Sequence, residues 1–105
     1  MPKPPQDKES WIENKLRLHG KELGYVVYKF VSPGSFGVPD RIFINRCGIA
    51  IFIEVKARGL AKNLSVHQQH QINRLKGNGA PVYVVDHLQE GKELLDYWLF
   101  KDRIG

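Results

Sequence analysis

The strongest constraint on the fold is a pair of apolar runs joined by a short turn-like segment. The runs are residues 41–44 (Arg-Ile-Phe-Ile) and 49–53 (Ile-Ala-Ile-Phe-Ile), and residues 45–48 (Asn-Arg-Cys-Gly) lie between them. Their β-branched and aromatic side chains favour strands, and the intervening segment is typical of a turn. The sequence therefore predicts a β-hairpin.

Charged residues flank this hairpin at its open end. Asp40 precedes the first run, and Glu54 and Lys56 follow the second. A three-residue loop with Gly48 in the left-handed conformation places Asp40 opposite Glu54, and strand alternation returns Lys56 to the same face. A two-residue loop shifts the pairing by one residue and weakens this arrangement. The three-residue loop predicts that the three side chains converge.

Both faces of the predicted hairpin are apolar, so it should lie at the centre of a sheet. Unpaired carboxylates at the end of a buried hairpin are costly, and proteins normally tolerate them only with a metal, a partner or a raised pKa. The acidic face carries Ile42, Ile44 and Phe52, and the other face carries Phe43, Ile51, Ile53 and Val55.

The residue types indicate which metal would suit such a site. Carboxylate oxygens favour a hard cation such as Mg²⁺ or Mn²⁺, and the four histidines lack the ligand spacing of a zinc site. A cation held by Asp40, Glu54 and the Val55 carbonyl would polarise a phosphate and lower the pKa of a bound water. Lys56 would orient that water or stabilise the developing charge. This chemistry fits hydrolysis of a phosphodiester.

Composition limits the class of protein. The 105 residues suffice for one domain, and 16 Lys and Arg against 11 Asp and Glu give a net charge of +5. This charge favours a polyanionic partner, nucleic acid first. The single cysteine, Cys47, excludes an internal disulfide and a cysteine-based zinc knuckle. No apolar run is long enough for a membrane span, and residues 1–5 lack the apolar core of a signal peptide, so we expect a soluble, cytoplasmic protein.

The remaining elements follow from periodicity and from start and stop signals. Ser65 and Gln68 have the spacing of a capping box, and the helix that they start should turn Val66, Gln69, Ile72 and Leu75 inward. The predicted order is αβββαβα, a central mixed sheet flanked by helices, of α/β class. We expect a mobile N-terminus (1–6), a helix (7–23), a strand (25–31), the hairpin, a helix (65–76), a buried strand parallel to its neighbour (82–85), a helix (88–99) and a tail (101–105).

Two loops are candidates for contact with a phosphate backbone. Residues 32–37 contain two glycines and two serines that would let a backbone approach closely, but an ordinary flexible connector has the same composition. Residues 57–63 form a basic loop that suits phosphate or an exposed connection equally. Lys29 would reach either the acids or water. The residues that we assign to DNA contacts are Lys29, Ser32, Arg58 and Lys62.

Three motifs taken together resemble those of the VRR-NUC (virus-type replication-repair nuclease) family of the PD-(D/E)xK nuclease superfamily. They are Gly37-Val38-Pro39-Asp40, then Glu54-Val55-Lys56 after a step of 14 residues, and Leu64-Ser65-x-x-Gln68. The likeness covers about residues 9–95 and is to the stand-alone phage or bacterial type. It implies a restriction-endonuclease-like core within a single nuclease domain at residues 7–100.

The resemblance also implies roles for individual residues. Asp40 and Glu54 resemble the metal-binding acids of the family, and Lys56 resembles its catalytic lysine. Gln68 matches a glutamine that lies close to the site in this family. We therefore count it among the catalytic residues, and its role as a helix cap is compatible with this.

A glutamate of the first helix commonly completes the metal shell in this family. From the residues alone, Glu9 and Glu13 are solvated charges beside Lys8 and Lys15. The resemblance changes this interpretation, because Glu13 lies where the family's glutamate is expected. Glu9, one turn earlier on the same face, remains a competitor.

The resemblance implies a Mg²⁺- or Mn²⁺-dependent DNA endonuclease. Small stand-alone members resemble Holliday junction resolvases, so we expect a homodimer that cuts branched DNA in repair or recombination, in a bacterial or phage-infected host cell. One alternative is a nuclease of flaps or single strands, which would use the same residues. The other alternative is a DNA-structure-binding subunit without catalysis, and the intact acids and lysine argue against it.

Overall fold

The computed structural model describes residue 4 and residues 7–102, and its elements follow the predicted order αβββαβα. The predicted N-terminal segment and tail lie largely outside these residues. No helix in the described part of the chain is long and apolar enough to cross a membrane. The elements are α1 (Glu9–Leu23), β1 (Val26–Lys29), β2 (Arg41–Ile44), β3 (Ala50–Val55), α2 (Val66–Gly77), β4 (Val82–Val85) and α3 (Leu88–Trp98).

The strands of the described residues form one mixed sheet in the order β1-β2-β3-β4. β1 and β3 both pair antiparallel with β2, whereas β3 and β4 are parallel. The α/β class, the central place of the β2–β3 hairpin and the parallel pairing of β4 are confirmed. A helix between β3 and β4 permits that parallel pairing, since the chain must cross back over the sheet before β4.

The hairpin has the register that a three-residue loop predicts. Arg41 pairs with Ile53, and the backbone N–H of Asn45 donates to the carbonyl of Ile49 at 2.9 Å. Gly48 has a φ of 80°, in the left-handed region that favours glycine. One step beyond the Arg41 pair, Asp40 therefore comes opposite Glu54.

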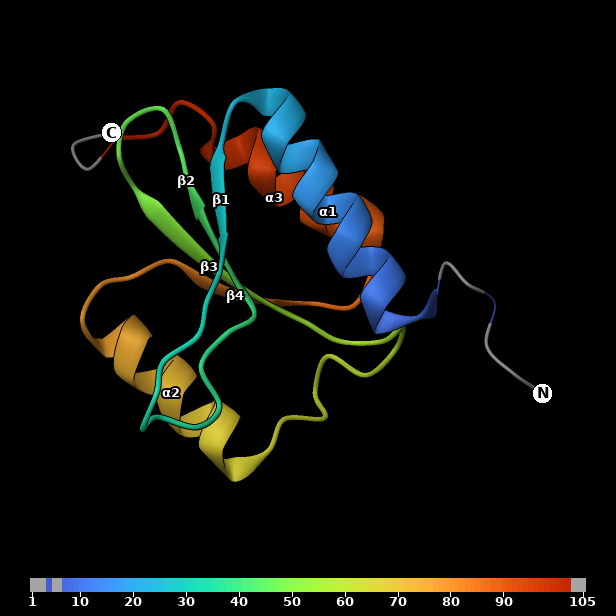
Figure 1. The fold of residues 1–105 in the computed structure, drawn as a ribbon, viewed down its shortest axis with the longest axis vertical. Helices are drawn as coiled ribbons and strands as arrows, with labels where there is room; N and C mark the ends of the chain where they lie inside the picture. Colours follow the sequence, from blue (N-terminus) through green and yellow to red (C-terminus); the bar gives the residue numbers. More distant parts are fainter. Residues whose placement is uncertain (1–3, 5–6, 103–105) are drawn as a thin grey trace.

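The helices cover the two faces of the sheet unequally. Figure 1 shows α1 and α3 side by side on one face and α2 at the other. On the face of α1 and α3, the hairpin side chains Phe43, Ile51 and Ile53 have no exposed surface. On the other face, Ile42 and Phe52 are only half-buried, because α2 packs mainly against the edge strand β4.

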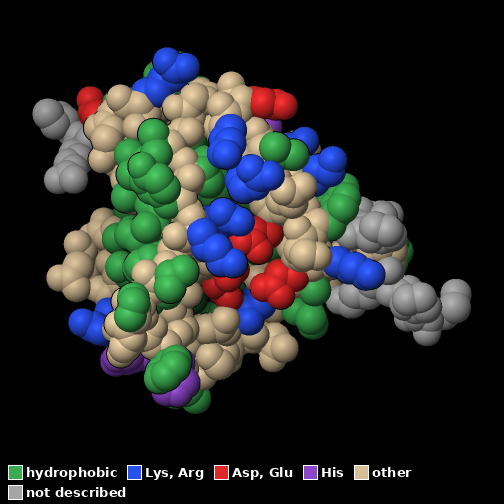
Figure 2. Space-filling model, viewed as in Figure 1, with side chains coloured by type: hydrophobic (Ala, Val, Ile, Leu, Met, Phe, Trp, Pro, Cys, Tyr) green, Lys and Arg blue, Asp and Glu red, His purple; other side chains and the backbone are tan. Residues whose placement is uncertain are grey.

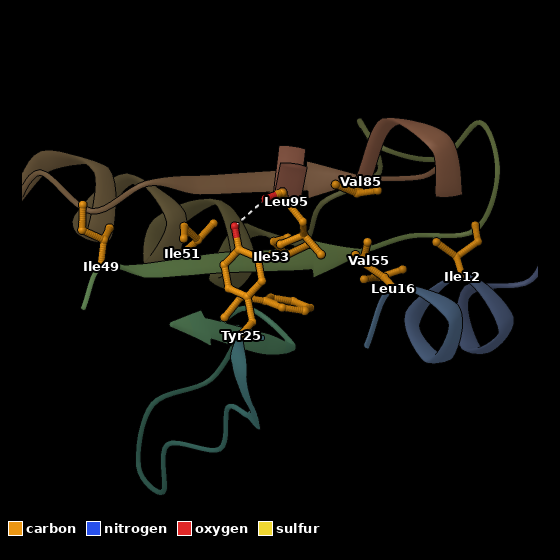
Figure 3. Close-up of a cluster of buried hydrophobic side chains, with 10 residues drawn as sticks. Ile12, Leu16, Tyr25, Ile49, Ile51, Ile53, Val55, Val85 and Leu95 are labelled. Atoms are coloured by element: carbon orange, nitrogen blue, oxygen red, sulfur yellow. Dashed lines mark hydrogen bonds between the residues drawn. The ribbon is translucent and has the colours of Figure 1, made fainter. Parts of the chain in front are cut away.

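The hydrophobic core lies between the sheet and the pair α1 and α3. Figure 3 shows the hydroxyl of Tyr25 directed at α3, where it donates to the carbonyl of Leu95 at 2.6 Å. Burial raises the pKa of Tyr25 above its usual value, so the hydroxyl keeps its proton. The buried members of this core are Ile12, Leu16, Tyr25, Phe43, Ile49, Ile51, Ile53, Val55, Val85 and Leu95.

The predicted inner side of α2 is only half correct. Ile72 is buried and Leu75 is half-buried, but Gln69 is exposed and Val66 is 85% exposed. The first turn of α2 lies beside the polar end of the hairpin and not over an apolar strand. Val66 and Gln69 therefore have no apolar surface to cover.

Candidate functional site

Three acidic side chains meet at the open end of the hairpin. Asp40 directly precedes β2, Glu54 is the last but one residue of β3, and Glu9 is the first residue of α1. Each offers a carboxylate oxygen, and these oxygens all lie within 4.8 Å of one another. The predicted convergence of Asp40 and Glu54 on one face is confirmed. We call these three residues the acid cluster.

The two strand acids differ in how their oxygens are satisfied. One oxygen of Asp40, Oδ2, accepts from the backbone N–H of Val55 at 2.8 Å. Glu54 is 2% exposed, and its Oε2 accepts from Nε2 of Gln68 at 2.6 Å. Its other oxygen, Oε1, is buried and lacks a hydrogen-bond partner among the described residues. An unpartnered buried carboxylate oxygen is costly, and a bound cation would satisfy it.

The proximity of the acids changes their acidity. Burial, and after it the nearby negative charge of Asp40, raise the pKa of Glu54 to about 8, although the charge of Lys56 opposes this. Partial burial, followed by the charge of Asp40, also raises the pKa of Glu9. Like charges held this close disfavour full ionisation. A divalent cation would remove this penalty because it stabilises the carboxylate forms.

Lys56 and Gln68 lie next to the acid cluster, where both contact Glu54. Nζ of Lys56 donates to Oε1 of Gln68 at 2.9 Å and lies 3.8 Å from Oε2 of Glu54. The same Gln68 oxygen accepts from the backbone N–H of Ser65 at 3.0 Å, and the Ser65 side chain accepts from the Gln68 backbone, which completes the capping box. The cap therefore fixes the amide that contacts both Lys56 and Glu54.

Glu13, which we predicted to complete the metal site, does not lie in the acid cluster. Its competitor Glu9, one helical turn earlier, lies there instead. Oε1 of Glu13 accepts from Nε of Arg41 at 2.8 Å, in an ion pair that is mostly buried. Glu13 follows Glu9 by about one helical turn, roughly 6 Å along the axis, which brings it level with β2. Arg41 shares the face of Ile53, toward α1, and therefore meets Glu13.

The residues assigned to DNA contacts lie outside the acid cluster. Lys29 and Lys62 are exposed, and Ser32 accepts a turn hydrogen bond from the N–H of Ser35 at 3.1 Å. Arg58 lies 3.8 Å from the carboxylate of Asp7. Figure 2 shows acidic side chains together near the middle of one face, with Lys and Arg side chains on several sides of them.

Sequence reasoning missed two contacts that shape this region. The ion pair of Arg41 and Glu13 had a signal, because an arginine in an otherwise apolar strand needs an acidic partner nearby. Asp86, directly after β4, accepts from the backbone N–H of Ala61 at 3.0 Å and so ties down the basic loop 57–63. A carboxylate at the end of a buried strand was the available signal for that contact.

The donor set of the acid cluster fits a hard divalent cation. Three carboxylates supply only oxygen ligands, and the buried Oε1 of Glu54 lacks a hydrogen-bond partner among the described residues. A lysine ammonium stands next to the same carboxylate. This combination of oxygen ligands and a fixed cationic donor is suited to binding and polarising a phosphate group.

Comparisons with known proteins agree with this chemistry, although no protein-family model matches the chain. A protein of Acyrthosiphon pisum secondary endosymbiont phage 1, named "Putative nuclease p44", is 39% identical over 79 residues, which are 75% of this chain and 83% of that protein. A solved structure named "VRR_NUC domain" has a TM-score of 0.78 and 28% identity, covering 86% of this chain and 96% of that one. A "VRR_NUC domain protein" with a TM-score of 0.72 and 17% identity, covering 90% and 92%, shares the fold.

Proposed function

The chain belongs to the VRR-NUC family of nucleases, and on this premise we propose that it is a metal-dependent endonuclease that hydrolyses phosphodiester bonds in branched DNA. The observation that carries the proposal is the buried Oε1 of Glu54, which lies in a cluster of three acids and lacks a hydrogen-bond partner among the described residues. A buried carboxylate oxygen without a partner favours binding of a cation, and the lysine next to it favours an anionic substrate.

The metal ligands in this proposal are Glu9, Asp40 and Glu54, together with the carbonyl of Val55. Mg²⁺ and Mn²⁺ suit these oxygen donors best. When bound, the cation would polarise the phosphate and lower the pKa of a coordinated water. The backbone N–H of Val55 donates to Oδ2 of Asp40 and so holds this carboxylate within the acid cluster.

Lys56 and Gln68 act on the reacting phosphate. The ammonium of Lys56 lies 3.8 Å from Glu54, close enough to donate to a phosphate oxygen or to the attacking water at the acid cluster. Oε1 of Gln68 accepts a hydrogen bond from Nζ at 2.9 Å and so holds the ammonium beside the carboxylate. A preorganised cation of this kind stabilises the charge that develops on the phosphoryl oxygens.

The substrate in this proposal is DNA that several basic side chains hold by its phosphates. The net charge of +5 favours such a partner, and Lys29, Ser32, Arg58 and Lys62 are the residues that we expect to contact the backbone. Binding should therefore weaken steeply as salt is raised, because each neutralised phosphate releases counterions.

The preference for branched DNA and the homodimer rest on the resemblance to small resolvases. A homodimer would present two sites to the two strands of a four-way junction, in repair or recombination within the bacterial or phage-infected cytoplasm. Val26 and Tyr28 of β1 are 47% and 58% exposed, and they supply apolar surface for a second copy. Light scattering at assay concentration tests this point, and a monomer would contradict the homodimer.

A substrate panel tests the proposed function. Duplex, flap, fork and four-way junction are each incubated with Mg²⁺, Mn²⁺ or a chelator, using wild type, Asp40→Asn, Lys56→Ala and Lys21→Ala. Lys21 is an exposed lysine in the last turn of α1 and serves as the matched control. We expect metal-dependent cutting of branched DNA by wild type and Lys21→Ala, whereas the two site variants bind DNA without cutting it.

Other outcomes of the panel separate the alternatives. Cutting confined to flaps or single strands would replace the resolvase activity with that of a simpler nuclease. DNA binding without cutting by wild type, under every metal condition, would favour a structure-binding subunit. Cutting by Asp40→Asn at the wild-type rate would contradict the assignment of the active site.

A further inference from the structure

A large aromatic side chain is exposed in the loop that leads into the acid cluster. Phe36, in the loop between β1 and β2, is 77% exposed. Its ring lies 5.9 Å from the ring of His67, centroid to centroid, with an angle of 54° between the planes. His67 belongs to the first turn of α2, and its ring contacts that of Phe36. Most of the phenyl surface therefore remains available to another planar group.

The loop that carries Phe36 is seated firmly on α2. Gly37 has a φ of 82°, and a Cβ atom at this position would lie 2.4 Å from the backbone carbon of His67 and 2.5 Å from the backbone nitrogen of Gln68. Only glycine permits such close contact between two backbones. This contact restricts the movement of the loop that carries Phe36, which lowers the entropic cost of binding a partner.

The position of Phe36 relates it to the proposed chemistry. Phe36 precedes Asp40 by four residues, so the two lie within about 14 Å even if the intervening chain is extended. Gly37 packs against Gln68, whose side chain donates to Glu54. Figure 2 shows histidine and hydrophobic side chains together near one edge of the face on which the acidic side chains gather. A DNA strand at the acid cluster would bring nucleotides near the cut within reach of this ring.

We propose that Phe36, supported by His67, stacks on an unpaired base next to the scissile phosphate and thereby selects branched or single-stranded DNA over intact duplex. This inference rests on the proposed nuclease function and adds a specificity-determining residue to it. In a duplex, both faces of each base are covered by neighbouring base pairs. An aromatic side chain can stack only where the base stack is interrupted, as at a branch or a single strand.

Protein and DNA variants together test this contact. Fluorescence anisotropy, without divalent metal so that the DNA stays intact, measures the affinity for a fork and for a duplex of the same length. Wild type is compared with Phe36→Ala, Phe36→Tyr and Phe100→Ala. Phe100 is a matched control, since it is 71% exposed but lies near Arg46, at the turn end of the hairpin.

We expect Phe36→Ala to weaken fork binding by roughly 5- to 100-fold, the range for loss of one stacked base, and to leave duplex binding unchanged. Phe36→Tyr and Phe100→Ala should bind as wild type does. A scan of abasic sites across the branch adds a readout that reports on a single base and not on the overall affinity of the variant. At one position, loss of the base should weaken binding by wild type but not by Phe36→Ala.

Two results would overturn the inference. One is equal fork affinity of Phe36→Ala and wild type. The other is an abasic effect that persists undiminished in Phe36→Ala at every position. Failure of wild type to bind or cut any DNA would instead overturn the proposed function, and this inference with it. Normal metal-dependent cutting by wild type, combined with an unchanged Phe36→Ala, would reject the stacking role alone.

Discussion

The two ends of the β2–β3 hairpin each bury one polar side chain, and they treat it in opposite ways. At the turn end, Asn45 is 5% exposed and uses its full hydrogen-bonding capacity. At the open end, Glu54 is 2% exposed, and one of its oxygens has no hydrogen-bond partner in the described part of the chain. The partners of Asn45 are the carbonyls of Trp98 and Lys101 and the backbone N–H groups of Cys47 and Ile49, at 2.7–2.9 Å.

This difference distinguishes a polar group that stabilises the fold from one that, in the proposed function, binds a ligand. Asn45 fastens the turn to the end of α3 and to the residues after it, and its hydrogen bonds offset the cost of burying an amide. Glu54 makes the free protein less stable than an uncharged residue would, and its open oxygen is available to a ligand. Burial alone does not identify a site, but burial with an unmet hydrogen-bonding capacity does.

The largest expected effect is on catalysis at the open end. Glu54→Gln keeps the shape of the side chain and removes its charge, so it should lower metal-dependent DNA cleavage by roughly a thousand-fold or more. The metal-free variant should be at least as stable as wild type to urea, because its amide is buried without the proton uptake that burial of Glu54 requires. Cleavage rates and urea unfolding on the same preparations check both statements, and a variant that cuts normally would contradict the functional half of the comparison.

The turn end should show the opposite behaviour. Asn45→Ala leaves two carbonyls and two N–H groups without their partner, so it should lower the free energy of unfolding by about 3 kcal/mol. Cleavage per folded molecule should remain at the wild-type level, since Asn45 is remote from the acid cluster. Equilibrium unfolding in urea measures the loss. Asn45→Asp, which keeps the accepting oxygen but places negative charge next to two carbonyls, should not restore the stability.

The dependence of stability on pH sharpens the comparison further. The pKa of Glu54 is about 8 in the native protein and 4.5 in an unfolded chain. Between these values the native state binds a proton that the unfolded state releases, so raising the pH through this window should destabilise the metal-free protein. Thermal unfolding of wild type and Glu54→Gln from pH 5 to 8 isolates the effect. A wild-type slope no steeper than that of the variant would contradict it.

The smallest effect concerns how α1 is held at the open end. The ion pair of Arg41 and Glu13 fixes α1 one turn beyond Glu9, so Glu13→Ala should raise the Mn²⁺ concentration for half-maximal cleavage by a few-fold. The rate at saturating metal should change little. The exchange Glu13→Arg with Arg41→Glu should restore the metal requirement, and Glu22→Ala, elsewhere on α1, should not alter it. An unchanged requirement in Glu13→Ala would show that the pair does not position Glu9.

Most of the fold could be predicted because its signals are local. The hairpin register depended on the loop length and on one glycine, Gly48, and both are encoded within a few residues. The capping box of Ser65 and Gln68 was equally local. These features placed Asp40, Glu54 and Lys56 together before any tertiary contact was known.

The remaining features depended on how elements pack. Glu9 and Glu13 share one face of α1, and the axial position of the helix against the sheet decides which of them reaches Glu54. Periodicity gives the face of a helix but not this position. Val66 was wrongly placed inward because spacing does not reveal that α2 covers only the edge of the sheet.

The central claim is that the open end of the hairpin is a divalent metal site, and Mn²⁺ binding tests it most directly. Electron paramagnetic resonance measures free Mn²⁺ during titration of wild type, Glu54→Gln and Asn45→Ala, without DNA and under conditions where each variant is folded. We predict that wild type and Asn45→Ala bind Mn²⁺ with similar affinity and that Glu54→Gln loses most of this binding. Equal binding by wild type and Glu54→Gln would contradict the account.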